Sequence, residues 1–439
     1  MELEIKNLNQ KNFLSLFLNI IYSSLNFFLI FILARFLGAA EFGKYIFSLS
    51  LVKFIGLPIL IGYPYFLLKK SSFLSKNRSV EVNKLINRNL YIILFYLLFS
   101  LVSFLFLKLI IPNFLGNYFN IIILGIIFIT PFLSIINSIS SIIRSSGGEL
   151  KGLIMENLLQ NLIFILLIFF LKIFINLENY SSYIFLFALS AFITLTYSFY
   201  QIRKIFKFKI FKINLMKNML RNLKESTSFI LFQIFVLVDK LLPIIILGFC
   251  QAPEIVANFK IAVQISAISG LALDSINKIV QPRFAKGFSN KEINKIENIA
   301  LTSNKFAFIY AIATSLIIFI FYEKFIGLFF GSFFILPKTT VFLILLTPLV
   351  NSFFGSVGSI INMSGNEKVS IFYCGITLLI GTIFGLVLIP IIGINGAAIS
   401  TLISSLLRGF ILWNKSKNLL NINSSFILSK VHKLIIPLK

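Results

Sequence analysis

Two adjacent charged residues, Asp239 and Lys240, lie inside the run Phe229–Cys250, which contains no other charge. A charged side chain at the centre of a bilayer costs about 2.5 to 3.5 kcal/mol, so such groups normally face protein or water. Pro243 adds a second irregularity, because it leaves the carbonyl of Asp239 without its helical hydrogen bond. Two explanations stay open: an ion pair with another helix at a structural kink, or contact with a substrate in a hydrated cavity.

A polar stripe follows the segment 255–280. Lys260, Gln264, Asp274 and Lys278 fall within about 40° of one line at 100° per residue, so they share one helix face. Asp274 and Lys278 also have the i,i+4 spacing of a favourable ion pair. Such a stripe on an apolar helix needs water or a partner helix. It therefore either lines a cavity or forms hydrogen bonds between helices.

The first half carries comparable features. Its polar rows are Ser15, Asn19, Tyr22 and Asn26 in one apolar segment, and Ser134, Asn137, Ser141 and Arg144 in another. Lys53 lies deep in a third apolar segment, and Arg35 lies at the end of the first. These segments and their counterparts in the second half are expected to border one cavity.

The sign of the charges indicates the substrate class. The basic candidates are Lys53, Lys240, Lys260, Lys278, Arg35 and Arg144, against the acidic candidates Asp239 and Asp274. A basic cavity attracts an anion, most strongly where water is scarce. Rows of Asn, Ser and Tyr suit sugar hydroxyls. The two acids are expected to hold basic groups or to respond to a coupling proton or ion.

The composition of the chain indicates whether these residues lie in water or in a membrane. The 439 residues are 58% hydrophobic and 13% charged, and the mean hydropathy is +0.96. These values predict a polytopic membrane protein with no room for a soluble domain. The single histidine, His432, lies in the C-terminal tail, and the chain has no GxxxxGK[ST] loop. Neither a metal site, a cofactor nor ATP hydrolysis is therefore expected.

About twelve membrane-spanning helices are predicted, because apolar runs of roughly twenty residues are long enough to cross the bilayer. Their continuous apolar character favours helices over a β-barrel. The expected spans are 13–34, 42–68, 89–111, 119–143, 151–175, 181–202, 227–249, 255–280, 304–330, 339–362, 368–390 and 395–414.

The connections are strongly asymmetric in charge. Most of the 40 Lys and Arg lie in the two tails and in alternate loops. Positive loops stay on the cytoplasmic side, so both termini are expected there. The net charge of +25 is thus mainly a matter of topology, and nucleic acid is not an expected partner.

The chain also repeats itself. At an offset of 218, Ser134–Glu149 matches Ser352–Glu367, with identical SG-x-E turns. This indicates two halves of six helices in the same orientation, an architecture that usually serves alternating access around a central site. The expected parts are an N-terminal six-helix bundle (1–202), a basic cytoplasmic linker (203–224), a C-terminal six-helix bundle (225–415) and a basic interfacial tail (416–439).

Four segments together resemble a known family, the polysaccharide flippases of the multidrug, oligosaccharidyl-lipid and polysaccharide exporter superfamily. They are Ala34–Tyr45, Asp239–Ala262, Gln281–Phe288 and Leu388–Ser404. Lys240 stands where arginine is more usual in this family, and Gly381 and Gly385 stand where asparagine is frequent. Lysine offers a point charge to a diphosphate but lacks the bidentate fork of arginine.

The resemblance implies two bundles around a V-shaped cavity in the bacterial cytoplasmic membrane. It further implies that the protein is not an enzyme but a flippase, which moves undecaprenyl-diphosphate-linked oligosaccharides to the outer leaflet for O-antigen or capsule synthesis. Expected partners are that lipid, the bilayer, a proton or cation gradient and polysaccharide-assembly proteins. The alternatives are a cation-coupled multidrug exporter and a flippase for another lipid-linked glycan. A membrane glycan polymerase or acyltransferase would need a large outer loop or a catalytic histidine motif.

Overall fold

The computed structural model describes residues 2–62, 64, 67, 92–102, 105–106, 116–145, 148–174, 178–205 and 216–425. For 2–19, 216–230 and some isolated positions it describes the backbone alone. Every regular element in these ranges is helical. The chain divides into two compact units, unit 1 (Met1–Ile234) and unit 2 (Phe235–Lys439).

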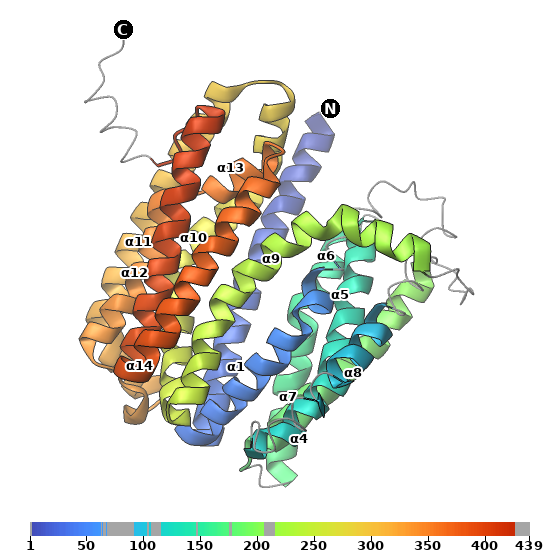
Figure 1. The fold of residues 1–439 in the computed structure, drawn as a ribbon. Helices are drawn as coiled ribbons and strands as arrows, with labels where there is room; N and C mark the ends of the chain where they lie inside the picture. Colours follow the sequence, from blue (N-terminus) through green and yellow to red (C-terminus); the bar gives the residue numbers. More distant parts are fainter. Residues whose placement is uncertain are drawn as a thin grey trace. The chain divides into compact units, whose positions relative to one another are not determined.

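Unit 1 contains most of the shorter elements (Figure 1). The elements of unit 1 include the long helix α1 (Glu2–Leu57), then η1 (Pro58–Gly62), η2 (Gly116–Tyr118), α4 (Phe119–Leu124), η3 (Gly125–Ile129), α5 (Thr130–Ser145), α6 (Glu149–Leu153), η4 (Ile154–Leu159), α7 (Gln160–Phe174) and α8 (Tyr180–Ile205). The segments η1, η3 and η4 are π-helical turns, and η2 is a 3₁₀ turn. Helices α5 and α8 pack on each other, and α7 packs on α8.

Unit 2 is built from long helices (Figure 1). The long helices are the second part of α9 (Met216–Cys250), α10 (Pro253–Ser289), α11 (Ile293–Phe329), α12 (Lys338–Phe354) and α14 (Glu367–Leu420); the short elements η5 (Ser332–Phe334) and α13 (Val357–Met363) lie between them in the sequence. Helix α10 packs on α11 and α12, and α12 packs on α14. The boundary between the units falls within α9, which already begins inside the predicted linker 203–224; residues 206–215 of that linker lie outside the described ranges.

Two of the helices contain a break at a glycine. In α1 the break is at Gly38, with φ 72°, between the first two predicted spans. In α14 it is at Ile392 and Gly393, and the chain folds back. A Cβ on Gly381 would lie 2.8 Å from Ser404 Cβ, and one on Gly385 would lie 3.6 Å from Ser400 Oγ. Helix α14 is therefore an antiparallel helical hairpin.

The described residues include six helices long and apolar enough to cross a membrane, or up to eight if each of two bent pairs forms one span. The bent pairs are Leu150–Glu156 with Gln160–Phe174 (41°) and Lys338–Phe354 with Val357–Met363 (44°). The structure is thus that of an all-helical membrane protein. The count of twelve spans remains a prediction, since several predicted spans lie partly outside the described residues.

A proline in unit 1 explains two of the polar residues of α5. Pro64 has no N–H, so the carbonyl of Leu60 loses its helical donor. Asn137 Nδ2 donates to that carbonyl at 2.9 Å, and Ser134 Oγ donates to the carbonyl of Ile59 at 2.8 Å. Side chains of a neighbouring helix commonly satisfy such groups inside a membrane. These two members of the predicted polar row therefore connect helices.

In unit 2, side chains likewise bind backbone groups that lack helical partners. This occurs at the break between α12 and α13, where Gly355 has φ 70°. The fully buried Asn304 of α11 accepts from the backbone N–H of Ser356 at 3.2 Å and from its hydroxyl at 2.9 Å. Asn304 Nδ2 donates to the carbonyl of Ser424 at 2.7 Å, and Ser424 Oγ donates to the carbonyl of Phe354 at 3.1 Å. The predicted interfacial tail 416–439 thus begins as part of the packed unit; residues 426–439 lie outside the described ranges.

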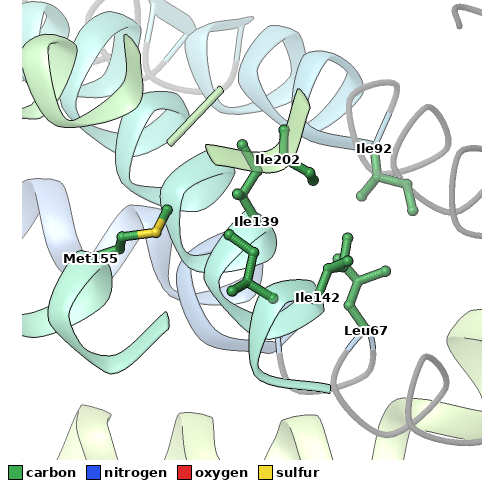
Figure 2. Packing of buried hydrophobic residues seen from close by; sticks show 7 residues of the cluster. Leu67, Ile92, Ile139, Ile142, Met155 and Ile202 are labelled. Atoms are coloured by element: carbon green, nitrogen blue, oxygen red, sulfur yellow. The ribbon is translucent and has the colours of Figure 1, made fainter. Parts of the chain in front are cut away.

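Each unit contains a buried apolar cluster. In unit 1, Ile139 and Ile142 of α5, Met155 of η4 and Ile202 of α8 pack with Leu67 (Figure 2). In unit 2, Val280, Phe284, Ile296, Ala300, Ile360 and Ile422 form the corresponding cluster. Inside a bilayer lipid tails are as apolar as these side chains, so close van der Waals packing holds the helices together.

Candidate translocation site

Asp239 of α9 is bound within unit 2. Its Oδ2 accepts from Arg408 Nη1 at 2.5 Å, and its Oδ1 accepts from Ser404 Oγ at 2.7 Å. The two charged side chains are 14% and 21% exposed, respectively. Arg408 and Ser404 both belong to the second limb of the α14 hairpin. Two explanations for Asp239 were proposed from sequence. The structure shows the ion pair with another helix.

Arg408 was not among the residues predicted from sequence. It is the only charge in the predicted span 395–414, and Ser404 precedes it by one helical turn. That position was a usable signal, because an ionisable residue inside a membrane span is a functional candidate with a partner to be found.

A small cavity adjoins Asp239, with both apolar and polar lining residues. It has a volume of ≈ 10 Å³ and is lined by Asp239, Thr382, Ser400 and Thr401, among others. This volume is close to the minimum that holds a water molecule. Gly381 and Gly385 also line it, and their lack of side chains lets the two limbs of α14 approach. The departure from the asparagine of the family thus has a packing reason.

The neighbouring lysine behaves differently. Lys240 is exposed, as expected for adjacent helical residues that point in different directions. In unit 1, Lys53 of α1 is half-buried, and its Nζ lies 5.8 Å from the centroid of the Phe187 ring. Within the part of the chain that the structure describes, no carboxylate lies within ion-pair distance of Lys53.

Arg144 is paired in unit 1. Its Nη1 lies 3.0 Å from Glu156 Oε2 in the π-helical turn η4, and Ser140 Oγ lies 3.1 Å from the same oxygen. Gly152 permits this approach, because a Cβ there would lie 2.4 Å from Arg144 Cγ. The structure thus pairs one predicted site residue, Arg144, with an acid that sequence reasoning missed.

The other candidates of unit 1 lie along α1. Tyr22 and Asn26 are half-buried, and Arg35 is exposed. Asn19 belongs to the part of α1 whose side chains lie outside the description.

The stripe on α10 is partly exposed. Lys260 and Gln264 are half-buried, whereas Asp274 and Lys278 are exposed. The ion pairs among the described residues do not include one between Asp274 and Lys278. The i,i+4 pair expected there is therefore not seen in the structure.

A family profile described as "Polysaccharide biosynthesis protein" matches residues 9–288, well over half of the chain. The chain belongs to this polysaccharide biosynthesis protein family. No curated protein sequence matches the chain closely enough to count as a relative.

Solved structures similar to this member of the polysaccharide biosynthesis protein family are transporters. An inward-facing multidrug resistance MATE family transporter of the MOP superfamily has a TM-score of 0.68 at 13% identity, covering 94% of both chains. The lipid II flippase MurJ, in an inward closed conformation, has a TM-score of 0.69 at 16% identity, covering 92% of this chain and 87% of that one. A MOP superfamily transporter from Pyrococcus furiosus, described by the reverse polarity of its binding pocket, has a TM-score of 0.60 at 14% identity, covering 93% and 94%. At these identities the likeness shows the MATE-like fold alone.

Proposed function

We propose that the protein is a flippase that moves undecaprenyl-diphosphate-linked oligosaccharide repeat units from the cytoplasmic to the outer leaflet of a bacterial cytoplasmic membrane. The units would then enter O-antigen or capsule synthesis. Two halves of six helices alternate access to a site near the membrane midplane, with both termini cytoplasmic. Membership of the polysaccharide biosynthesis protein family and the transporter fold support this role. No covalent step is required.

One observation carries the choice of an anionic substrate. The carboxylates of Asp239 and Glu156, both inside apolar helices, are each neutralised by an arginine. Lys53 has no such partner among the described residues, and Lys240 is exposed. With the exposed Asp274 counted against Lys53, Lys240 and the exposed Arg35, the remaining charge is still positive, which favours a diphosphate over a cation.

In this proposal the basic, polar and acidic side chains have different roles. Lys53, Lys240 and Lys278 draw in the diphosphate, with Lys260 beside them and Arg35 and Arg144 at the edges. Hydroxyl and amide groups of Asn19, Tyr22, Asn26 and Gln264 bind sugar hydroxyls. Asp239 holds Arg408, and Asp274 serves as the acid that responds to a coupling proton or cation.

A second candidate is a cation-coupled multidrug exporter. Two observations favour it: the fold of a multidrug transporter, and the exposed Asp274, which would attract a cationic drug. The lipid II flippase MurJ has the same fold. A flippase for a different lipid-linked glycan is therefore a third candidate function. The sign of the charge in the substrate-binding pocket distinguishes an exporter of cationic drugs from a flippase of anionic lipids.

The deciding experiment follows lipid-linked oligosaccharide in a strain that lacks the gene. We expect this lipid to accumulate on the cytoplasmic leaflet, surface polysaccharide to be lost, and the gene to restore both. Normal surface glycan with altered sensitivity to cationic drugs would instead establish the exporter.

Complementation with lysine variants tests the site. Lys53→Ala and Lys53→Glu should lower surface polysaccharide at least tenfold at equal membrane abundance, with Lys53→Arg retaining most of it. Lys338→Ala is the matched control, since this side chain is 66% exposed in an exposed ion pair. If Lys53→Glu retained full activity, the proposed role of Lys53 in substrate binding would be wrong.

A further inference from the structure

An apolar groove lies between two walls of unit 1, apart from every charged residue discussed above. One wall is α4, η3 and α5; the other is α8. The groove has a cavity volume of ≈ 280 Å³. Its principal lining residues are Leu124, Phe128, Phe132, Phe185, Leu189 and Phe192. Ser181, near the start of α8, is the only lining residue with a polar side chain.

The groove is built rather than incidental. Leu124 and Phe128 flank and occupy the π-helical turn η3, and such turns often occur at functional sites. In the same turn, Gly125 packs against Val52, because a Cβ there would lie 2.4 Å from Val52 Cγ2. Val52 belongs to α1, which does not line the groove. Close packing on α1 therefore keeps this wall from shifting to fill the hollow.

Aromatic rings cross from one wall to the other. The ring centroids of Phe128 and Phe132 are 6.0 Å apart, and those of Phe132 and Phe192 are 5.7 Å apart. Phe128 is 43% exposed and Phe192 is 46% exposed. An occupant would thus contact a continuous row of rings.

The surroundings determine what kind of occupant fits. Both walls belong to candidate membrane spans, Phe119–Ser145 and Tyr180–Lys204, so hydrocarbon surrounds them. No charged residue lines the groove, and therefore it suits a lipid tail rather than a headgroup. At about 30 Å³ for a group the size of a water molecule, the volume holds roughly nine carbon-sized groups, or about two isoprene units.

The position along the membrane is also informative. Residues 181–192 of α8 rise by about 16 Å, half of a ~30 Å hydrocarbon layer. The expected topology places the start of α8 at the outer face, so the groove faces the outer leaflet. A methyl-branched chain is stiffer than a straight acyl chain and loses less conformational entropy on being held in a fixed groove.

We propose that this groove binds part of the isoprenoid chain of the lipid-linked substrate on the outer-leaflet side, as the headgroup leaves the cavity. The proposal rests on the proposed function for the origin of that chain. The groove itself is tested with a probe that carries no sugar.

The probe is a photoreactive polyprenyl phosphate, added to the purified full-length protein in lipid nanodiscs. We expect cross-links to concentrate on the groove residues and to disappear with excess undecaprenyl phosphate, but not with equal hexadecyl phosphate. Leu124→Trp, which fills the groove, should reduce labelling at least fivefold. Leu166→Trp is the matched control, because Leu166 is 67% exposed on α7 outside the groove. If Leu124→Trp inserts poorly, Ala188→Leu fills the groove with a smaller change.

Two results would overturn the proposal: cross-links spread evenly over groove and non-groove residues such as Leu166 and Ile173, or equal competition by hexadecyl phosphate, which would make this an ordinary lipid contact. Failure of the proposed function is separately visible. If groove labelling holds but the deletion strain shows normal surface glycan, the flippase assignment fails and an isoprenoid site remains. If labelling disperses while deletion blocks surface glycan, only the groove proposal fails.

Discussion

At the level of single residues, the ionisable groups in the membrane fall into paired and uncompensated sets. Asp239 has Arg408, and Arg144 has Glu156, whereas Lys53 faces the ring of Phe187 without a carboxylate among the described residues. Breaking a buried pair is expensive because the remaining charge stays desolvated. The paired residues are therefore expected to contribute first to stability, whereas the proposed role of Lys53 is in binding.

Removing one charge of the Asp239–Arg408 pair should destabilise the protein more than removing both. We expect Asp239→Asn to lower the free energy of unfolding by roughly 3 kcal/mol, and the double change Asp239→Asn with Arg408→Gln to recover part of that loss. Thermal unfolding of the purified protein measures both.

The control for this cycle is Lys240→Gln, because Lys240 is adjacent but exposed; its unfolding temperature should not move. Equal loss in the single and double variants would show that the two charges are not energetically coupled.

The residue scale also shows where sequence reasoning stops. An ion pair to another helix was one of two explanations for Asp239, yet its partner is 169 positions away, and periodicity within one helix carries no information about such a contact. The spacing of Asp274 and Lys278 matches that of an ion pair, yet this pair is not among those of the described residues, because helical spacing alone does not determine which partner a side chain contacts.

At the level of elements, broken helices are held by side chains from their neighbours. The break after α12 has Asn304 and Ser424, and the segment before Pro64 has Ser134 and Asn137. The prolines and glycines were visible in the sequence, and the break at Gly38 lies between two predicted spans. The sequence did not show which polar residues would bind the backbone groups at these breaks. A row of polar residues that lines a cavity has the same helical period as one that connects two helices.

The break at Gly355 should tolerate no side chain. Gly355 and Gly365 both have positive φ, 70° and 85°, but a Cβ on Gly355 would lie 2.2 Å from Asn304 Cγ, whereas one on Gly365 meets open space. Gly365→Ala should therefore cost about 1 kcal/mol from backbone strain, and Gly355→Ala clearly more. Comparable unfolding temperatures for the two variants would contradict this reading of the break.

The proline at position 64 allows a coupled test. Asn137→Leu should destabilise unit 1 by about 1 to 3 kcal/mol, because the carbonyl of Leu60 loses its donor. In a Pro64→Ala background the restored N–H serves that carbonyl, so the same change at Asn137 should cost less. A double-mutant cycle in thermal unfolding gives the coupling energy, and strict additivity would refute the argument.

At the level of the whole molecule, charge asymmetry predicts which end of each helix faces the cytoplasm, and the two cysteines can report it. Cys250 is exposed at the end of α9, and Cys374 is buried. With both termini cytoplasmic, the end of α9 lies outside. A membrane-impermeant maleimide added to spheroplasts should therefore label Cys250, and Cys250→Ser should abolish labelling. Labelling only after permeabilisation would invert the topology.

The packed segment that follows α14 has a consequence for biosynthesis. Ile422 and Ser424 are fully buried against α10, α11 and the α12–α13 break, yet they leave the ribosome after α9 to α14, the helices that the structure describes in unit 2. Until they emerge, the carbonyl of Phe354 and the amide of Asn304 lack these partners. Unit 2 therefore completes its folding late, after its helices are already inserted, and a cell that degrades unfinished membrane proteins would recognise it in that interval. Truncation before Ile422 should shorten the lifetime of the protein in the membrane before it alters any step of transport.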